Sequence, residues 1–234
     1  MMNEYYEKIT SLLDEIHATQ AEAIAHAGAI VGETIRSGGI VHTFGSGHSG
    51  AIAYEAHGRA GGLAAVGAIT DPLRGLAEKV EGYGRALMAP LRPGERDSMI
   101  VISNSGRNSL PIEVAMVAKE KGLKVIAITS LAHSRSVTSR HSSGKRLFEL
   151  ADVVIDNRGD PGDASVTVEG LETPVGPTST ITGAYIMNEI TIAAVCWLLD
   201  HGIEPPVFRS ANLDGSKEHN DNLRSRYTAP RSMW

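Results

Sequence analysis

Two glycine- and serine-rich turns contain the residues of this 234-residue chain that are best suited to bind an anion. The first, residues 45–50, has the sequence Gly-Ser-Gly-His-Ser-Gly, and the second, residues 103–109, has the sequence Ser-Asn-Ser-Gly-Arg-Asn-Ser. Each turn follows an apolar run and precedes a helical pattern. Glycine lets backbone amides approach a ligand closely, hydroxyls donate hydrogen bonds, and helix starts attract negative charge. Both turns therefore predict a phosphate-binding cup.

The first turn also matches the dinucleotide-binding pattern G-x-G-x-x-G. Asp71, which lies 21 residues after Gly50, could then hold a ribose hydroxyl. That pattern is weak by itself, and a dinucleotide would leave the second turn without a function. No Gly-Lys-Ser/Thr follows the glycines, as nucleotide-triphosphate hydrolysis through a Walker loop would require. A single phosphate between the two turns is therefore favoured over a dinucleotide and over turns with a purely structural role.

Short apolar segments alternate with helical patterns, and this alternation indicates the scaffold of the two turns. We expect strands at residues 40–44, 63–69, 98–103, 124–129 and 153–155. Helices are expected at residues 6–36, 49–60, 111–121 and 178–201. The pattern is typical of an α/β fold, a doubly wound parallel five-stranded sheet with helices on both faces and a long N-terminal helix. Because ligands of such sheets bind beyond the carboxyl ends of the strands, the two turns should meet at one edge.

The chain divides into three parts. Residues 1–36 form the N-terminal helix, which packs on the core or on a partner subunit; residues 37–201 form the α/β domain, and residues 202–234 a tail. Within the domain, residues 72–92 indicate a broken helix with loops, and residues 157–177 are rich in Gly, Pro and Asp. Residues 133–146 contain five serines and several basic side chains. This basic segment is either a solvated loop or a rim over an anionic ligand.

Composition excludes several classes of function. A net charge of -5 and a pI near 6.0 argue against a general nucleic-acid or membrane-surface binder. Cys196 is the one cysteine, and no H-x-x-x-H pair occurs, so neither a disulfide, a metal nor another cofactor is expected. The first residues lack the apolar core of a signal peptide, and no run approaches the roughly 18 apolar residues of a membrane span. We therefore expect a cytoplasmic protein.

Three segments, taken in order, resemble the motifs of the sugar isomerase (SIS) domain, which has a flavodoxin-like fold: residues 45–49, 103–108 and 178–180. The resemblance covers roughly residues 24–199. It implies a phosphosugar site, in which Ser49, Ser103, Ser105 and Asn108 hold the phosphate while the amides of Asn104 and Gly106 assist. The full set of implied ligands comprises Gly45, Ser46, Gly47, Ser49, Ser103, Asn104, Ser105, Gly106, Asn108, Thr178, Ser179 and Thr180.

The same resemblance extends to particular groups of SIS proteins. The single-domain layout looks like phosphoheptose isomerase, and the segment around residues 176–180 is similar to arabinose-5-phosphate isomerases. Residues 205–220 of the tail resemble an uncharacterised bacterial group of stand-alone SIS proteins. These likenesses imply a homodimer or homotetramer that takes a small sugar phosphate.

Aldose–ketose isomerisation requires a base that moves a proton between adjacent carbons and a donor that moves one between oxygens. Related enzymes carry a glutamate ten residues after the motif serine, where this chain has Arg59. Glu55, one helical turn earlier, either replaces that base or forms a surface ion pair with Arg59. His48 in the first turn is a candidate for the second proton. His219 is another, if the tail folds over the site of a neighbouring subunit.

The sequence therefore predicts a sugar-phosphate isomerase-like protein. Two alternatives stay open: a sensor that binds a phosphosugar without converting it, and a lyase that cleaves a sugar-acid ether or a related bond. Regulators with this domain carry a helix-turn-helix ahead of it. Only about 39 residues precede the first strand here, so we expect no direct DNA binding.

Overall fold

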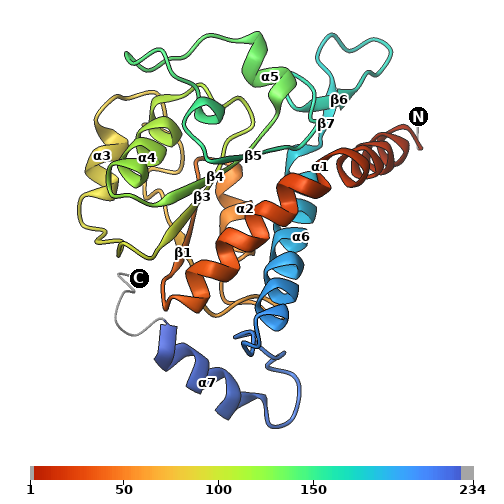
Figure 1. The fold of residues 1–234 in the computed structure, drawn as a ribbon. Coiled ribbons are helices and arrows are strands. Elements are labelled where there is room, and N and C mark those ends of the chain that lie inside the picture. Colours follow the sequence, from red (N-terminus) through yellow and green to blue (C-terminus); the bar gives the residue numbers. More distant parts are fainter. Residues whose placement is uncertain (1–2, 228–234) are drawn as a thin grey trace.

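A five-stranded parallel sheet forms the centre of the computed structural model, which describes residues 3–227 (Figure 1). Its strands are β1 (Val41–Gly45), β2 (Val66–Ile69), β3 (Ser98–Ile102), β4 (Lys124–Thr129) and β5 (Val153–Asp156). They lie in the order β2-β1-β3-β4-β5, and each neighbouring pair is parallel. The predicted α/β class and the five-stranded parallel sheet are confirmed.

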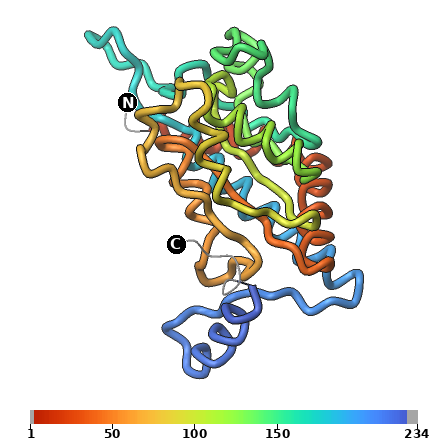
Figure 2. The backbone as a smooth tube through the Cα atoms, turned by 90° about the vertical axis from the view of Figure 1, so that its left-hand side faces the viewer, coloured from red at the N-terminus to blue at the C-terminus, as the bar shows by residue number. Residues whose placement is uncertain are grey.

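Helices cover both faces of this sheet, as the alternation of segments predicts (Figures 1 and 2). One face is covered by α1 (Glu4–Arg36), α2 (Ser49–Glu55) and α6 (Ser179–Asp200), and the other by α3 (Tyr83–Met88) and α4 (Ser109–Glu120). The shorter elements are α5 (Leu131–Ser136), the 3-10 turn η1 (Leu147–Glu149) and α7 (Ser216–Tyr227). The long N-terminal helix is confirmed, and it packs along α6 of the same chain.

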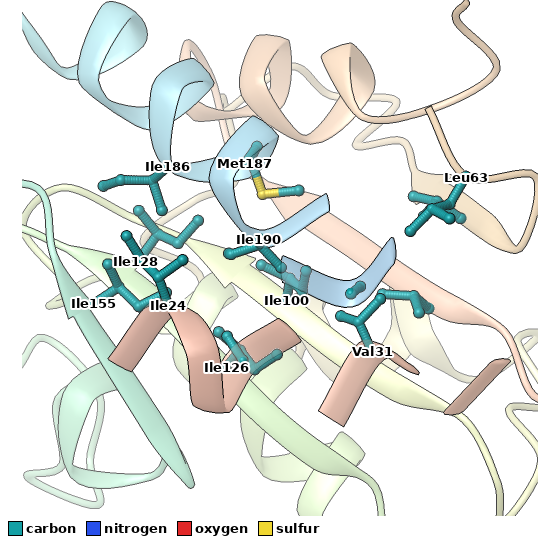
Figure 3. Packing of buried hydrophobic residues seen from close by; sticks show 14 of the residues in the cluster. Ile24, Val31, Leu63, Ile100, Ile126, Ile128, Ile155, Ile186, Met187 and Ile190 are labelled. Atoms are coloured by element: carbon teal, nitrogen blue, oxygen red, sulfur yellow. The ribbon is translucent and has the colours of Figure 1, made fainter. Parts of the chain in front are cut away.

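The two layers have separate apolar cores because successive strand residues point to opposite faces. Ile100 of β3 packs toward α1 and α6, whereas its neighbours Met99 and Val101 pack toward α3 and α4. Figure 3 shows the first core, in which Ile24 of α1 and Ile190 of α6 meet the strand isoleucines. Burial on both faces explains why the strands are apolar without alternation.

Helix α6 is the one helix among residues 3–227 that is long and apolar enough to span a membrane by length and composition. Polar residues interrupt any continuous apolar run in this helix, as the sequence predicts, although its mean hydropathy reaches 1.4 over 18 residues. Its apolarity serves the core: Ile186, Ile190, Ala194 and Leu198 are buried. Gly28 of α1 allows close packing, since a Cβ there would lie 2.5 Å from Ala193 Cβ.

Four segments have structure that the sequence analysis did not predict. Helix α2 ends at Glu55 instead of continuing to residue 60, and the chain turns at Gly58, where φ is +67°. Residues 157–177 contain a hairpin of β6 (Ala164–Val166) and β7 (Val175–Pro177), and the basic segment begins within α5. The tail folds as α7 although it is polar, because Leu223 packs on Phe208.

Candidate functional site

The first turn, residues 45–50, joins β1 to α2 and contains a buried hydroxyl without a protein partner. A Cβ on Gly45 would lie 2.2 Å from the backbone oxygen of Ser49, so only glycine permits this reversal. Gly47 has a φ of +58°, which also favours glycine. Ser46 is 8% exposed, and its Oγ makes no hydrogen bond. Since buried hydroxyls are normally bonded, this one is suited to a ligand.

The second turn, residues 103–109, joins β3 to α4 and is more tightly bonded within the protein. Ser103 Oγ accepts a hydrogen bond from the Gly106 amide at 3.2 Å. Ser134 Oγ donates to the backbone oxygen of Ser105 at 2.8 Å. Gly106 has a φ of +59°, and a Cβ there would lie 2.8 Å from Ser134 Oγ. This turn is therefore rigid before any ligand binds.

Both turns leave the sheet at the same level. Gly45, the last residue of β1, pairs with Ile102, the last residue of β3. The chain moves outward from β1 to β2 and returns to β3, so β1 and β3 flank the point where the strand order reverses. Ligands of open α/β sheets bind at this switch point. The expectation that the turns meet at one edge is confirmed.

The third predicted motif, residues 178–180, adjoins the second turn but has its donors engaged. The amides of Thr178 and Ser179 donate to Asp163 Oδ1 at 3.1 and 2.8 Å, and Ser179 Oγ donates to Asp163 Oδ2 at 2.8 Å. A Cβ on Gly159 would lie 3.4 Å from Asn104 Oδ1 and 3.8 Å from Thr178 Oγ1. A phosphate would therefore have to replace Asp163 to reach these groups; Thr180 is exposed.

Asn108, a predicted phosphate ligand, forms hydrogen bonds with two segments that are distant in the sequence, the one between β2 and α3 and the basic segment. Its Nδ2 donates to Glu78 Oε1 at 2.6 Å, and its Oδ1 accepts from Arg140 Nη1 at 2.7 Å. Arg140 lies in the basic segment, for which a rim over an anionic ligand was one of two interpretations. Glu78 lies between β2 and α3 and had no recognisable signal. Its contact with Asn108 depends on how residues 71–82 fold.

Asp71, the candidate ribose ligand of the dinucleotide alternative, holds its own segment together. Its side chain accepts hydrogen bonds from the amides of Leu73 and Gly75 at 3.0 and 2.7 Å and from Tyr83 Oη at 2.7 Å. Burial, and then the hydrogen bond to Asp71, raise the pKa of Tyr83. Because both carboxylate oxygens have partners in a buried site, Asp71 does not suit a ribose hydroxyl.

Glu55 and His48 lie at opposite ends of α2. Glu55 ends the helix and forms an ion pair with Arg59, with both side chains about half exposed (45% and 48%). Six residues separate Glu55 from Ser49, which corresponds to about 9 Å along the helix axis. His48 is exposed and, with Tyr54 and Arg74, lines a cleft of about 460 Å³ beside the first turn.

His219 lies far from the turns of its own chain. Its Nε2 is 2.9 Å from the backbone oxygen of Val207. Helix α7 packs near Ala64, before the start of β2, and so lies at the amino end of the sheet (Figure 1). A role for His219 in a phosphosugar site would therefore require the site of another subunit.

His133 is a titratable side chain near the second turn that sequence reasoning did not single out. Burial and the Arg107 guanidinium lower the pKa of His133. The negative charge of Asp163 raises this pKa and offsets part of that effect. Its Nδ1 is buried and has no hydrogen-bond partner. A neutral imidazole between the second turn and the third motif can accept a proton. The sequence did not single out His133 because its segment contains five serines, a composition that is also typical of a solvated loop.

The parallel sheet and the two turns at its switch point define an α/β protein with a phosphate-binding type of site. Comparison with known proteins identifies its family. Residues 4–130 match the family model of the SIS domain, and this chain belongs to that family. A UPF0309 protein of Listeria monocytogenes is 43% identical over 95% of both chains. A UPF0309 protein of Shouchella clausii is 42% identical over 97% of this chain and 96% of its own. The resemblance to SIS proteins is confirmed.

Solved structures have the same fold. A phosphoheptose isomerase from Francisella tularensis aligns with a TM-score of 0.59 at 19% identity, covering 82% of this chain and 95% of its own. The sugar isomerase domain of an RpiR transcription factor from Sphaerobacter thermophilus aligns at 0.50 and 19%, covering 86% and 98%. The NanR protein of Vibrio vulnificus, complexed with ManNAc-6P, aligns at 0.53 and 14%, covering 96% and 66%.

Proposed function

We propose that this protein binds a sugar phosphate and interconverts its aldose and ketose forms by proton transfer. The observation that carries the proposal is the buried, unpartnered hydroxyl of Ser46 beside the second turn at the β1/β3 switch point. A phosphate monoester offers three acceptor oxygens, which suits amide and hydroxyl donors. The likeness to NanR, which is complexed with ManNAc-6P, supports a phosphosugar.

The proposal assigns the phosphate to Ser49, Ser103, Ser105 and Asn108, with the amides of Asn104 and Gly106, and it places the unpartnered hydroxyl of Ser46 in contact with the same phosphosugar. Arg140 touches Asn108 and supplies the positive charge that these neutral donors lack. The basic segment that contains Arg140 thus serves as a rim over the anion. The sugar body would extend from the turns toward the segment between β2 and α3.

In the reaction, a base removes the proton from C2 of the aldose, which gives an enediol, and returns it to C1. The hydroxyl proton moves from O2 to O1, so no oxidant or reductant is needed. Glu55 is the proposed base, and His48, or His219 from another subunit, moves the second proton. His133 is a further candidate because its imidazole is neutral and adjoins the second turn.

A homodimer or homotetramer is proposed from the outer face of α6. Ile192 and Leu199 are 56% and 59% exposed, and Ile181 is 41% exposed. Large apolar side chains along one helix face favour burial against a partner. Light scattering should give at least twice the mass of one chain, 24.8 kDa. A stable monomer would contradict this part of the proposal.

A non-catalytic phosphosugar sensor is the second candidate function. Arg59 stands where related enzymes keep their base, and it forms an ion pair with Glu55. The fold is also that of the sugar isomerase domain of a transcription factor. A sensor needs the two turns but no base, so ligand binding without turnover would favour it.

Calorimetry and NMR separate these candidates. The intact protein is titrated with fructose 6-phosphate, arabinose 5-phosphate, sedoheptulose 7-phosphate and NAD⁺, and conversion of each sugar is followed by proton NMR. We expect binding of at least one phosphosugar, exchange with solvent of its C2 proton if it is an aldose or of a C1 proton if it is a ketose, and no binding of NAD⁺. Binding of NAD⁺ alone would overturn the phosphosugar proposal. Conversion at the wild-type rate by Glu55→Gln would remove Glu55 as the base.

A further inference from the structure

The segment between β2 and α3, residues 71–82, contacts both the first and the second turn. Asp71 fixes its start through the amides of Leu73 and Gly75. Gly75 lies against the first turn, since a Cβ there would be 3.3 Å from Gly47 Cα and 3.7 Å from Ser46 Oγ. Residues 78 and 79 lie against the second turn. We call residues 71–82 the bridging segment.

Glu78 is held at the second turn by its backbone and by its side chain. Its backbone oxygen accepts from the Leu110 amide at 3.0 Å, and its Oε1 accepts from Asn108 Nδ2 at 2.6 Å. The next residue, Lys79, accepts from Ser109 Oγ through its backbone oxygen at 3.3 Å. These contacts fix a carboxylate at the second turn, beside a predicted phosphate ligand.

Charges of opposite sign flank Asn108. Arg140 donates to its side-chain oxygen, whereas Glu78 accepts from its side-chain nitrogen. A phosphate is attracted to the Arg140 side, so the remainder of the ligand faces Glu78. A carboxylate only accepts hydrogen bonds, and therefore suits hydroxyl or ammonium groups. A second anionic group placed there would meet a like charge.

We propose that Glu78 determines the class of phosphosugar that this protein takes. It accepts hydrogen bonds from the sugar body of a neutral or amino-sugar monophosphate, and it disfavours phosphosugars that carry a second negative charge. Sugar bisphosphates and phosphorylated sugar acids are thus poor ligands, and this includes the sugar-acid ethers of the lyase alternative. Specificity arises from repulsion as well as from contact. The inference rests on the proposed function, since a phosphate must occupy the turns.

The test compares two matched ligands in three proteins by calorimetry. Fructose 6-phosphate and 6-phosphogluconate both carry six carbons and one phosphate, but only the second carries a carboxylate. Glu78→Gln removes the charge and keeps an oxygen that can accept from Asn108. Glu95→Gln makes the same charge change at an exposed residue before β3, at the other end of the sheet. Inorganic phosphate serves as the ligand without a sugar body.

We expect the wild type and Glu95→Gln to prefer fructose 6-phosphate by about tenfold or more, and Glu78→Gln to lose most of that preference. An unchanged preference in Glu78→Gln would overturn the inference and leave the proposed function intact. An equal gain in affinity for all three ligands would also overturn it, because Glu78 would then repel anions without selecting. If none of the proteins bound phosphate or either sugar, the proposed function and the inference would both fail. Thermal melting confirms that each variant is folded.

Discussion

The two ends of the central sheet use polar side chains differently. At the amino end, Asp97 accepts hydrogen bonds from the amides of Ile40 and Gly94 at 2.9 and 2.8 Å, and it pairs with His42 at 3.0 Å. At the carboxyl end, Ser46 Oγ is buried and has no partner. A polar group that is satisfied within the protein stabilises the fold, whereas an unsatisfied one costs stability until a ligand binds.

Strands β4 and β5 show the same difference between a satisfied polar group at the amino end and an unsatisfied one at the carboxyl end. Asp152, before β5, accepts from the Val125 amide and from Lys119 Nζ, each at 2.8 Å. At the carboxyl end, His133 Nδ1 is buried without a partner. Substitutions at the amino end should therefore change stability without changing binding, whereas substitutions at the carboxyl end should change binding and should lower stability only where they remove a hydrogen bond within the protein. The predictions below test that separation, from the largest expected effect to the smallest.

Ser105→Leu should lower the affinity for a phosphosugar by more than about 100-fold, because a bulky apolar side chain would fill the second turn and remove a hydroxyl donor. Isothermal calorimetry with fructose 6-phosphate measures the effect. Ser225→Leu, on α7 at the amino end, is the control and should bind as the wild type does. Unchanged affinity in Ser105→Leu would remove this residue from the site.

Asp97→Asn should lower the free energy of unfolding by about 2 kcal/mol, because it weakens hydrogen bonds to a charged, buried acceptor. Urea denaturation provides the measurement. Phosphosugar affinity should stay within about twofold of the wild type. A large loss of affinity in a folded variant would contradict the separation between the two ends.

Ser46→Ala and Ser103→Ala form a matched pair at the carboxyl end. Ser46→Ala should lower phosphosugar affinity about tenfold without loss of stability, because its Oγ has no protein partner. Ser103→Ala should also lower the free energy of unfolding by about 1 kcal/mol, since it removes the bond from the Gly106 amide. Equal losses of stability in the two variants would refute the contrast between the turns.

Acid should weaken the amino end. Burial raises the pKa of Asp97, but the hydrogen bonds from His42, Ile40 and Gly94 outweigh it, so the folded-state pKa lies below the ordinary value of 3.8. The stability that this carboxylate contributes is therefore present above pH 3.8 and is lost as the pH falls through the lower folded-state pKa. Urea midpoints at pH 6, 4 and 3 should fall less steeply in Asp97→Asn than in the wild type. Parallel curves would show that Asp97 does not contribute.

Arg59→Ala should have the smallest effect. The Glu55–Arg59 pair is half exposed and Arg59 lies beyond the end of α2, and exposed ion pairs of this kind contribute only about 0.2–1 kcal/mol. Urea denaturation should detect a change no larger than this. The same variant frees Glu55, so a rise in isomerisation rate would favour Glu55 as a base restrained by its partner. A loss of stability above about 1 kcal/mol would show that the pair does more than this.

Prediction from sequence succeeded where the signal is local. Glycine at 45 and 106 is required by a close approach or a positive φ, and both positions were recognisable as turns. It failed where partners are distant. Nothing in the sequence links Glu78 to Asn108, 30 residues away, and α2 ends at Glu55 although the helical pattern continues. The hairpin around β6 and β7 was missed because its strands have three residues each.

The sequence by itself determined the parallel sheet, the two serine-glycine turns and their place after β1 and β3, because apolar periodicity and glycine preferences act over a few residues. Only the tertiary structure decided which polar groups are satisfied. Hydrogen bonding is a property of atoms brought together across the fold, so the unpartnered Ser46, the engaged Ser179 and the carboxylate of Glu78 at the second turn could be recognised only there.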